Sequence, residues 1–337
     1  MSKKNYVGHL IHTPRDFTKP NFNLGSRDMV KALINASFEN QGGIVTNTHR
    51  ARLPALKLFI DFIKTNKSIK RLNDIEKQHV WYFGEFLKNS ADKELLSHVT
   101  ARDYLSHVNR ALAQARGDEA CVVKATRDLD FLPKSGIATI DEAMKEAIHS
   151  KALTQVNPEV GFVMQLQRAF GFRFREASLF DATRALEELN KGLQPMLVRG
   201  TKGGQPRALP EITEAKHQLL VQVATYQQSH QQHSLIPVHQ SLKAFQSDAW
   251  RQTKAADDAY RSHGERKHFA CQYYFELVGV RCPVQASIAH GKAHYQYIAT
   301  TLNISEPEAR QRDREARLRL SELLGHHRMG ITNAYLG

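Results

Sequence analysis

The sequence predicts a mainly α-helical protein of two domains, with a small antiparallel β-sheet in the second domain. The chain has 337 residues, and a single hydrophobic core seldom grows beyond about 250–300 residues. Apolar residues recur at three-to-four-residue spacing through most of the chain, which is typical of amphipathic helices. One segment, 196–210, instead combines two short strand-like runs with a Gly-rich turn and predicts a β-hairpin.

The first part of the chain predicts a bundle of helices. Residues 1–25 are polar and basic with scattered Pro and Gly, so we expect a flexible basic N-terminal arm. A first helix is expected from Ser26, as N-cap, to Asn40. Further helices are expected over 50–66, 74–88, 91–97 and 100–116. They define a helical domain over 26–132 with a basic surface, which either binds DNA or only keeps an amphipathic bundle soluble.

A change of pattern marks the domain boundary. Pro133 and Gly136 interrupt the helical periodicity between about 125 and 139. The second domain is then expected over 138–337. It should contain helices over 140–150 and 157–170, the hairpin, and a long helix that opens with a capping box at Ser305 and Glu308.

The charge of the chain bears on its partners. Lys and Arg number 47 against 34 Asp and Glu, a formal net charge of +13. This excess favours nucleic acid over an anionic membrane surface, although a merely soluble basic protein stays open. No stretch resembles a signal peptide or approaches the ~18 apolar residues of a membrane span. We therefore expect a cytoplasmic, nucleoid-associated protein without membrane contact.

The cysteines and histidines do not indicate a metal site. The three cysteines are far apart and form no CxxC pair, so they predict buried reduced thiols. They are Cys121, Cys271 and Cys282. The histidines at positions 230, 233 and 239 lack cysteine or carboxylate companions at ligand spacing. A solvated polar loop is the better interpretation of that stretch.

Five separated segments carry the functional information, although each has an ordinary explanation by itself. They are Gly171-Phe-Arg-Phe-Arg-Glu176, Thr201-Lys-Gly-Gly204, His263-Gly-Glu-Arg-Lys-His-Phe-Ala270, Leu324-Gly-His326 and Tyr335. Alone, Arg173 and Glu176 would be a surface ion pair of little energetic consequence. In this order, the set resembles the catalytic domain of the tyrosine recombinases. That family has Gly-Leu-Arg-x-x-Glu, a lysine in a hairpin turn, His-x-x-Arg-His-x-Phe-Ala, Leu-Gly-His, and a tyrosine nine residues later. Tyr335 follows His326 by nine residues.

The resemblance implies both the organisation and the activity of the protein. The domain over 138–337 would be the α+β tyrosine recombinase catalytic domain, and 26–132 the helical core-binding domain. The protein would be a site-specific recombinase or integrase, acting for a mobile element on double-stranded DNA as a homotetramer. It would cleave through a covalent 3′-phosphotyrosine and need no metal or other cofactor. A type IB topoisomerase and a non-catalytic DNA-binding accessory protein of the same fold remain alternatives.

The resemblance also assigns roles to residues. Arg173 and Arg266 would clamp the phosphate, because each guanidinium presents a planar fork of donors to phosphate oxygens. His326 would add a donor to the same phosphate. His263 would act as general base for the tyrosine or hold it by a hydrogen bond, two roles that stay open.

The remaining roles concern the nucleophile and the leaving group. A phenol, with an ordinary pKa of about 10, is a weak nucleophile at neutral pH, so cationic surroundings are part of the requirement. Tyr335 would attack the phosphorus. Lys202, on the hairpin turn, would protonate the departing 5′-oxygen. Glu176 would orient Arg173 and support its helix.

The sequence departs from the family pattern in three respects. Phe172 replaces a leucine, and Lys267 stands where the family commonly has a histidine. The interval between the second arginine and the last histidine is longer than in compact members. Its surplus, roughly 275–312, would be an extra helical element over the DNA or a protein–protein surface. Because Leu336 and Gly337 alone follow Tyr335, we expect the docking of this segment to depend on DNA or a partner subunit.

Overall fold

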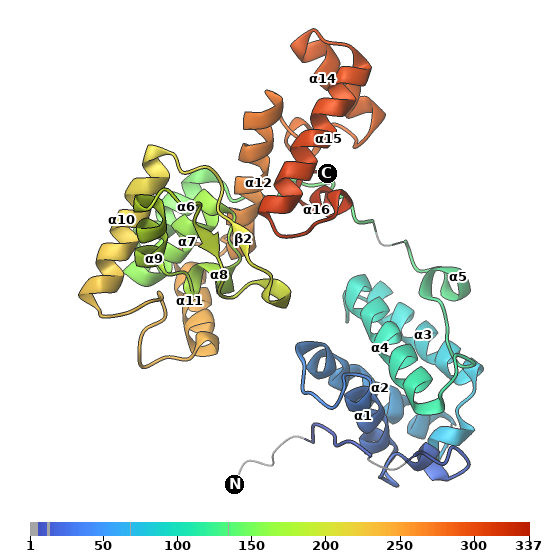
Figure 1. Cartoon of the computed structure of the whole chain (residues 1–337). Helices are drawn as coiled ribbons and strands as arrows, with labels where there is room; N and C mark the ends of the chain where they lie inside the picture. The colour runs from blue at the N-terminus through green and yellow to red at the C-terminus, as the bar shows by residue number, and fades with distance from the viewer. Residues whose placement is uncertain (1–5, 12–13, 68, 134) are drawn as a thin grey trace. The chain divides into compact units, whose positions relative to one another are not determined.

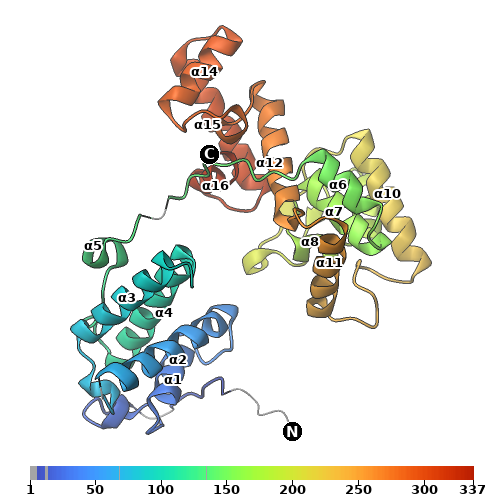
Figure 2. The same ribbon diagram turned by 180° about the vertical axis from the view of Figure 1, so that it is seen from behind.

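The computed structural model describes residues 6–11, 14–67, 69–133 and 135–337, and it is mainly helical (Figures 1 and 2). The chain forms two compact units, Met1–Lys134 and Ser135–Gly337. Within the described ranges the β-structure is one two-stranded antiparallel sheet, so the predicted fold class is confirmed. No helix in these ranges is long and apolar enough to cross a membrane.

The first unit is a helical bundle around one hydrophobic core. Its elements are η1 (Pro20–Asn23), α1 (Met29–Glu39), α2 (Asn47–Lys67), η2 (Leu72–Asp74), α3 (Lys77–Asp92), α4 (His98–Arg116) and α5 (Ala125–Leu129). Helix α4 begins at Ser97, whose hydroxyl accepts the Thr100 amide, and ends at Gly117 in the left-handed conformation. It packs against α1, α2 and α3. The rings of Phe59 and Phe83 meet edge to face in the core at 5.0 Å.

Two predicted helix boundaries in this unit are wrong. The N-cap of α1 is Asp28, whose carboxylate accepts the Lys31 amide at 2.9 Å, while Ser26 hydrogen-bonds the Asp28 amide. The separate helix expected over 91–97 does not form. Instead α3 continues to Asp92 and a turn with Glu94 in the left-handed conformation follows.

The described part of the predicted N-terminal arm lies on the helical bundle, which differs from the expected free arm. Tyr6 Oη donates to Asn35 Oδ1 at 2.6 Å, and Arg15 Nη1 donates to the Ala115 carbonyl at 2.8 Å. Leu24 is fully buried. The polar composition of 1–25 concealed the apolar side chains that hold the segment by burial. Residues 1–5 and 12–13 of the predicted arm lie outside the described residues.

The second unit contains two hydrophobic cores that follow each other along the chain. The elements around the first core are α6 (Glu146–Leu153), α7 (Pro158–Phe170), α8 (Phe174–Ser178), α9 (Ala182–Asn190), β1 (Met196–Leu197), η3 (Lys202–Gly204), β2 (Arg207–Ala208), α10 (Glu214–Ser229) and α11 (Leu242–Ala256). The predicted hairpin is present, with Met196 opposite Ala208 and Leu197 opposite Arg207. The helix expected over 140–150 begins later, at Glu146.

The second core is built by the C-terminal elements. They are α12 (Ser262–Val278), α13 (Pro283–Ala286), α14 (Lys292–Leu302), α15 (Glu306–Leu323), η4 (Met329–Thr332) and α16 (Asn333–Leu336). The Ser305 hydroxyl accepts the Glu308 amide, as the predicted N-cap requires. The surplus segment is helical, and Ile298 of α14 is fully buried in this core. The segment is therefore an integral part of the second unit's packing.

Helix α12 joins the two cores, because it packs against α7 on one side and α15 on the other. Gly171 ends α7 with φ of +66°, and its Cα lies so close to the Phe269 ring that no side chain fits there. This close approach brings the loop after α7 onto α12. All three cysteines are free and buried, as predicted.

Candidate active site

Arg266 lies at the centre of the site, between the two cores of the second unit. Its side chain is fully buried. Nη1 donates to the Gly171 carbonyl, and Nη2 donates to the Leu324 carbonyl at 2.8 Å. Two loops that are far apart in sequence therefore meet on one guanidinium. Burial lowers the pKa of Arg266 to about 10, which leaves the group charged at neutral pH.

The phenol of Tyr335 is hydrogen-bonded within this cluster. Arg266 Nε donates to Tyr335 Oη at 3.2 Å, and His326 Nε2 lies 3.2 Å from the same oxygen. Arg266 Nη2 is also 3.4 Å from His326 Nε2. Because a guanidinium only donates, Nε2 is an acceptor and the proton of the neutral ring is on Nδ1. The phenol can then donate its own proton to His326.

Glu176 forms the base of the site and binds two arginines at once. The fully buried carboxylate accepts the Arg173 amide and Arg173 Nη1, both at 2.7 Å. It also accepts Arg207 Nη1 at 2.8 Å and Nη2 at 2.6 Å. Burial alone would raise the pKa of Glu176, but the Arg207 and Arg173 bonds lower it to about 2. The carboxylate is therefore ionised and holds the predicted clamp arginine, Arg173, in place.

Arg207 is the residue that sequence reasoning missed. It lies on β2, is 7% exposed, and its Cδ packs 3.3 Å from the position that a Cβ on Gly325 would occupy. It thus touches both Glu176 and the loop before His326. A charged residue at a buried strand position is unusual, but the sequence does not show which carboxylate pairs with it.

The two histidines occupy different places in the site. His326 is bonded to the phenol, whereas the ring of His263 lies 5.7 Å from the Tyr335 ring, centroid to centroid. Desolvation, followed by the charges of Arg266 and Arg173, lowers the pKa of His326 to about 4. Desolvation, then Arg266 and Lys267, lowers the pKa of His263 to about 4. Both imidazoles are therefore neutral at pH 7.

Lys202 stands apart from the other predicted residues. It is exposed in the hairpin turn, next to Gly203 with φ of +75°. Among the described residues it hydrogen-bonds to none of the other six, although its charge helps to lower the pKa of His326. The structure thus brings together Arg173, Glu176, Arg266, His326 and Tyr335, with His263 at their edge and Lys202 on the neighbouring turn.

Lys267, the departure from the family pattern, is paired with a residue outside the cluster. Its ammonium forms an ion pair with Glu142, in the loop before α6. The side chain therefore anchors that loop on α12. His268, the next residue, hydrogen-bonds to none of the predicted site residues within the described part of the chain.

The segment of Tyr335 is anchored on the chain's own residues. Leu336 is fully buried, and Tyr335 is 7% exposed. The Ala138 amide donates to the Asn333 carbonyl at 2.8 Å. This anchoring differs from the expectation that docking depends on DNA or a partner subunit, because the segment 135–337 itself supplies the contacts.

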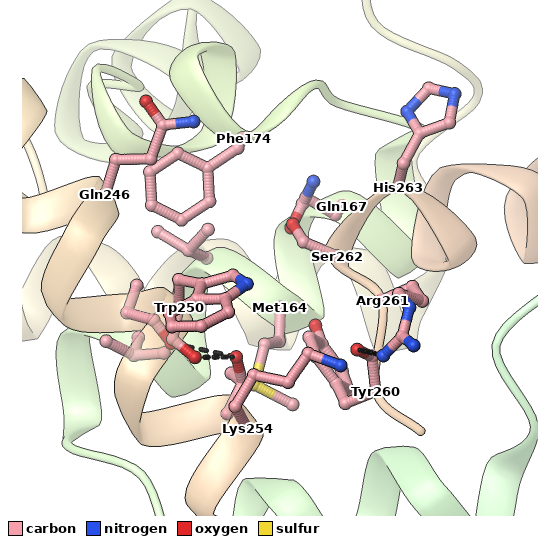
Figure 3. Close-up of a pocket in the computed structure, with 14 residues that line it drawn as sticks. Met164, Gln167, Phe174, Gln246, Trp250, Lys254, Tyr260, Arg261, Ser262 and His263 are labelled. Carbon is pink, nitrogen blue, oxygen red and sulfur yellow. Dashed lines mark hydrogen bonds between the residues drawn. The ribbon is translucent and has the colours of Figure 1, made fainter. Parts of the chain in front are cut away.

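A cavity of about 350 Å³ adjoins the site on the side of α11 (Figure 3). Met164, Phe174, Trp250 and Tyr260 give it an apolar lining, and His263 stands at its edge. None of the other predicted catalytic residues lines it. Within the described ranges, no group of three or more His, Cys, Asp or Glu side chains is arranged to hold a metal ion.

Comparison with known proteins identifies the family. A family model described as "Integrase" matches residues 134–276, and one described as "Phage integrase SAM-like domain" matches residues 29–126. The chain belongs to the tyrosine recombinase family. The first match ends before His326 and Tyr335, so the assignment of these two residues depends on their spacing and geometry.

Two solved structures have the same fold. One is a lambda integrase tetramer bound to a Holliday junction, with 12% identity and a TM-score of 0.52, covering 83% of this chain and 76% of that chain. The other is a lambda integrase(75-356) dimer bound to a COC′ core site, with 14% identity and a TM-score of 0.53, covering 77% of this chain and 93% of that chain. No curated protein sequence gives a significant match.

Proposed function

We propose that the protein is a site-specific DNA recombinase or integrase that cleaves and rejoins DNA through a covalent 3′-phosphotyrosine at Tyr335. The observation that carries this proposal is the position of the phenol oxygen, 3.2 Å from both Arg266 Nε and His326 Nε2. A guanidinium favours the phenolate, and an adjacent neutral imidazole accepts the proton. Together they meet the two requirements for a tyrosine nucleophile.

The phosphate would bind to the two arginines. Arg173 is partly exposed, with 24% of its side chain accessible, whereas Arg266 is fully buried and its donors are bonded to protein atoms. Phosphate oxygens would therefore reach Arg173 first and replace the phenol on Arg266 as the nucleophile turns toward the phosphorus. Fixed cationic donors then stabilise the charge of the transition state without a metal ion.

Proton transfers complete the proposed reaction. Tyr335 gives its proton to His326 and forms a bond to phosphorus, and the bond to the 5′-oxygen breaks. Lys202 supplies the proton that this oxygen needs, since its ammonium is exposed on the neighbouring turn and paired with none of the other predicted residues that the structure describes. His263, at the edge of the cluster, would lie beside the bound phosphate. The phosphotyrosyl bond conserves the energy of the phosphodiester, so a 5′-hydroxyl can reverse the step.

The partner and the assembly follow from the same proposal. The net charge of +13 suits double-stranded DNA, and the two solved neighbours are DNA-bound integrase assemblies. We propose that residues 26–132 bind the core site, that 138–337 carry out the chemistry, and that the active form is a homotetramer. Recombination of a mobile element with nucleoid DNA in the cytoplasm is the biological role that fits this activity.

A nicked suicide substrate tests the activity directly. DNA with a nick beside the cleavage position loses a short fragment after attack, which traps the covalent adduct on a denaturing gel. The wild-type protein should form the adduct and Tyr335→Phe should not, while both bind the DNA equally well. An adduct formed by the Phe variant would overturn the choice of nucleophile.

The same preparation separates the alternatives. Relaxation of a supercoiled plasmid that carries no particular site, without strand exchange, would indicate a topoisomerase. Binding to many candidate sites without any adduct would indicate an accessory protein. Genomic repeats that flank the gene would supply the candidate sites.

A further inference from the structure

The residues on both sides of Tyr335, the Asn333 side chain and the Gly337 backbone, are held by side chains that take no part in the chemistry described above. Arg317 Nη1 donates to Asn333 Oδ1 at 2.9 Å, and Arg317 Nη2 donates to the Gly337 carbonyl at 3.0 Å. His290 Nδ1 also lies 2.9 Å from the Gly337 carbonyl. Because a carbonyl only accepts, His290 is the donor. One guanidinium therefore spans the nucleophile's short helix from end to end.

Arg317 is itself fixed by a buried carboxylate. Its side chain is 2% exposed, and Nε lies 3.0 Å from both oxygens of Asp313. Tyr274 Oη donates to the same carboxylate at 2.5 Å. Burying such a pair costs desolvation energy that an apolar pair would not. Because Asp313 binds Nε of Arg317, the nitrogens Nη1 and Nη2 stay free to donate to the segment of Tyr335. A Met or Leu side chain has no such donors.

The surplus segment supplies the other part of this support. His290 lies between α13 and α14, and the Cα of Gly337 approaches Val284 and Pro283 of α13 too closely to leave room for a side chain. Helices α13 and α16 pack against each other. The extra residues, roughly 275–312, thus pack against the short helix that carries Tyr335.

The phenol of Tyr335 is held by other residues than its backbone. The phenol bonds to Arg266 and His326, the groups that face the phosphate in the proposed reaction. A phosphate therefore competes with the phenol, but it does not compete with the contacts of Arg317 or His290. The side chain of Tyr335 can turn while its backbone stays in place.

We propose that Arg317 and His290 are positioning residues: they anchor the backbone of the nucleophile segment on the catalytic unit while the phenol moves from Arg266 to the phosphorus. This inference rests on the proposed function for its kinetic consequence, but not for the anchor itself. It gives the surplus segment an intramolecular role that neither expectation, contact with DNA or with another subunit, included.

Three variants and a control test the anchor. Arg317→Met removes both donors, and His290→Ala removes one from a half-buried site with little risk to folding. Arg317→Lys keeps the charge beside Asp313, but a single ammonium cannot reach Asn333 and Gly337 together. Arg314→Met, on the exposed face of α15, is the matched control. Thermal unfolding identifies any variant that fails to fold.

Hydrogen exchange of a peptide covering 329–337, in the full-length protein, measures the anchor without any need for activity. We expect faster exchange in Arg317→Met, Arg317→Lys and His290→Ala than in the control. At saturating suicide DNA, adduct formation should slow by about 10- to 100-fold in the Arg317 variants, since small displacements of a reacting group have effects of this size. The DNA dissociation constant should not change.

The outcomes distinguish whether the anchor exists from whether it positions the tyrosine for cleavage. Wild-type exchange in both Arg317→Lys and His290→Ala would overturn the anchor. Faster exchange with a wild-type rate of adduct formation would overturn its role in positioning. If the wild-type protein formed no adduct on any DNA, the proposed function would fail, and the exchange data alone would still decide whether the anchor exists.

Discussion

Glu176 and Arg207 form a bidentate ion pair in which both carboxylate oxygens accept a guanidinium donor, at 2.8 and 2.6 Å. Arg207 lies on β2, at the base of the hairpin whose turn carries Lys202. Glu176 lies on α8, beside Arg173. The pair therefore connects the hairpin that carries the proposed general acid with the helix beside the proposed phosphate clamp.

Replacement of Arg207 should destabilise the second unit. Arg207→Met leaves the buried Glu176 carboxylate with fewer donors, and breaking a buried pair of this kind costs about 3–5 kcal/mol. Urea denaturation measures the loss. Arg199→Met, an exposed arginine on the same hairpin, is the control and should have a midpoint near that of the wild type. Equal midpoints for the two variants would show that the pair contributes no net stability.

Acidification should remove the contribution of Glu176 to stability. Its pKa is about 2 in the folded protein, below the ordinary value of 4.5 for a glutamate. The contribution is therefore complete above about pH 5 and is lost as the pH falls toward 2, and its size is on the order of 3 kcal/mol. Urea denaturation between pH 3 and pH 7 should show the gap between the wild type and Glu176→Gln narrowing at low pH. A gap of constant size would contradict the shifted pKa.

The two histidines should differ in their effect on cleavage. His326 bonds the phenol and His263 does not, so His326→Gln should slow adduct formation by about 10²–10⁴-fold and His263→Gln by less. Single-turnover cleavage of the suicide substrate gives both rates. The reverse order would transfer the role of general base to His263.

The pH dependence of cleavage should reflect the lowered pKa of His326. The pKa of His326 is about 4, so the ring is unprotonated at neutral pH. The rate with subsaturating DNA should therefore stay constant down to about pH 5 and fall below it. At saturating DNA the fall should begin at a higher pH, because a bound phosphate stabilises the protonated ring. A fall centred near pH 6.5 under both conditions would contradict the depressed pKa.

A DNA substrate with sulfur in place of the departing 5′-oxygen should identify the proton donor. If Lys202 protonates the 5′-oxygen, Lys202→Ala should cleave ordinary DNA about 10²–10⁴-fold more slowly than the wild type. A 5′-bridging phosphorothiolate releases a thiolate, which needs no proton to depart, so the variant should cleave it at nearly the wild-type rate. An equal loss on both substrates would assign the general acid to another group.

The sequence predicted residues that the fold brings together, but not the hydrogen bonds that connect them. The motif spacing brought forward Arg173, Glu176, Arg266, His326 and Tyr335, and the fold gathers these five. Arg207 was missed because its significance comes from one buried carboxylate 31 residues away. The order of the two histidines around the phenol was likewise open, because it depends on how α12 and the loop after α15 meet.

The N-terminal segment shows why its composition led to the wrong prediction of a free arm. Average polarity predicted a free segment, but burial is decided by individual side chains, and Leu24 alone removes a large apolar surface from water. The helix expected over 91–97 failed for a similar local reason. Short apolar spacing is compatible with a turn when a residue such as Glu94 adopts the left-handed conformation.

What the sequence by itself determined was the fold class, the family resemblance and the residue types of the site, since periodicity and motif spacing are properties of the chain in one dimension. The tertiary structure decided what surrounds Tyr335. Arg317 and His290 lie 18 and 45 residues before it, and they reach its segment because α13 packs against α16 and α15 packs against η4, which directly precedes α16. Contacts between elements depend on packing that no local pattern encodes, so the contacts around Tyr335 became visible only in the folded chain.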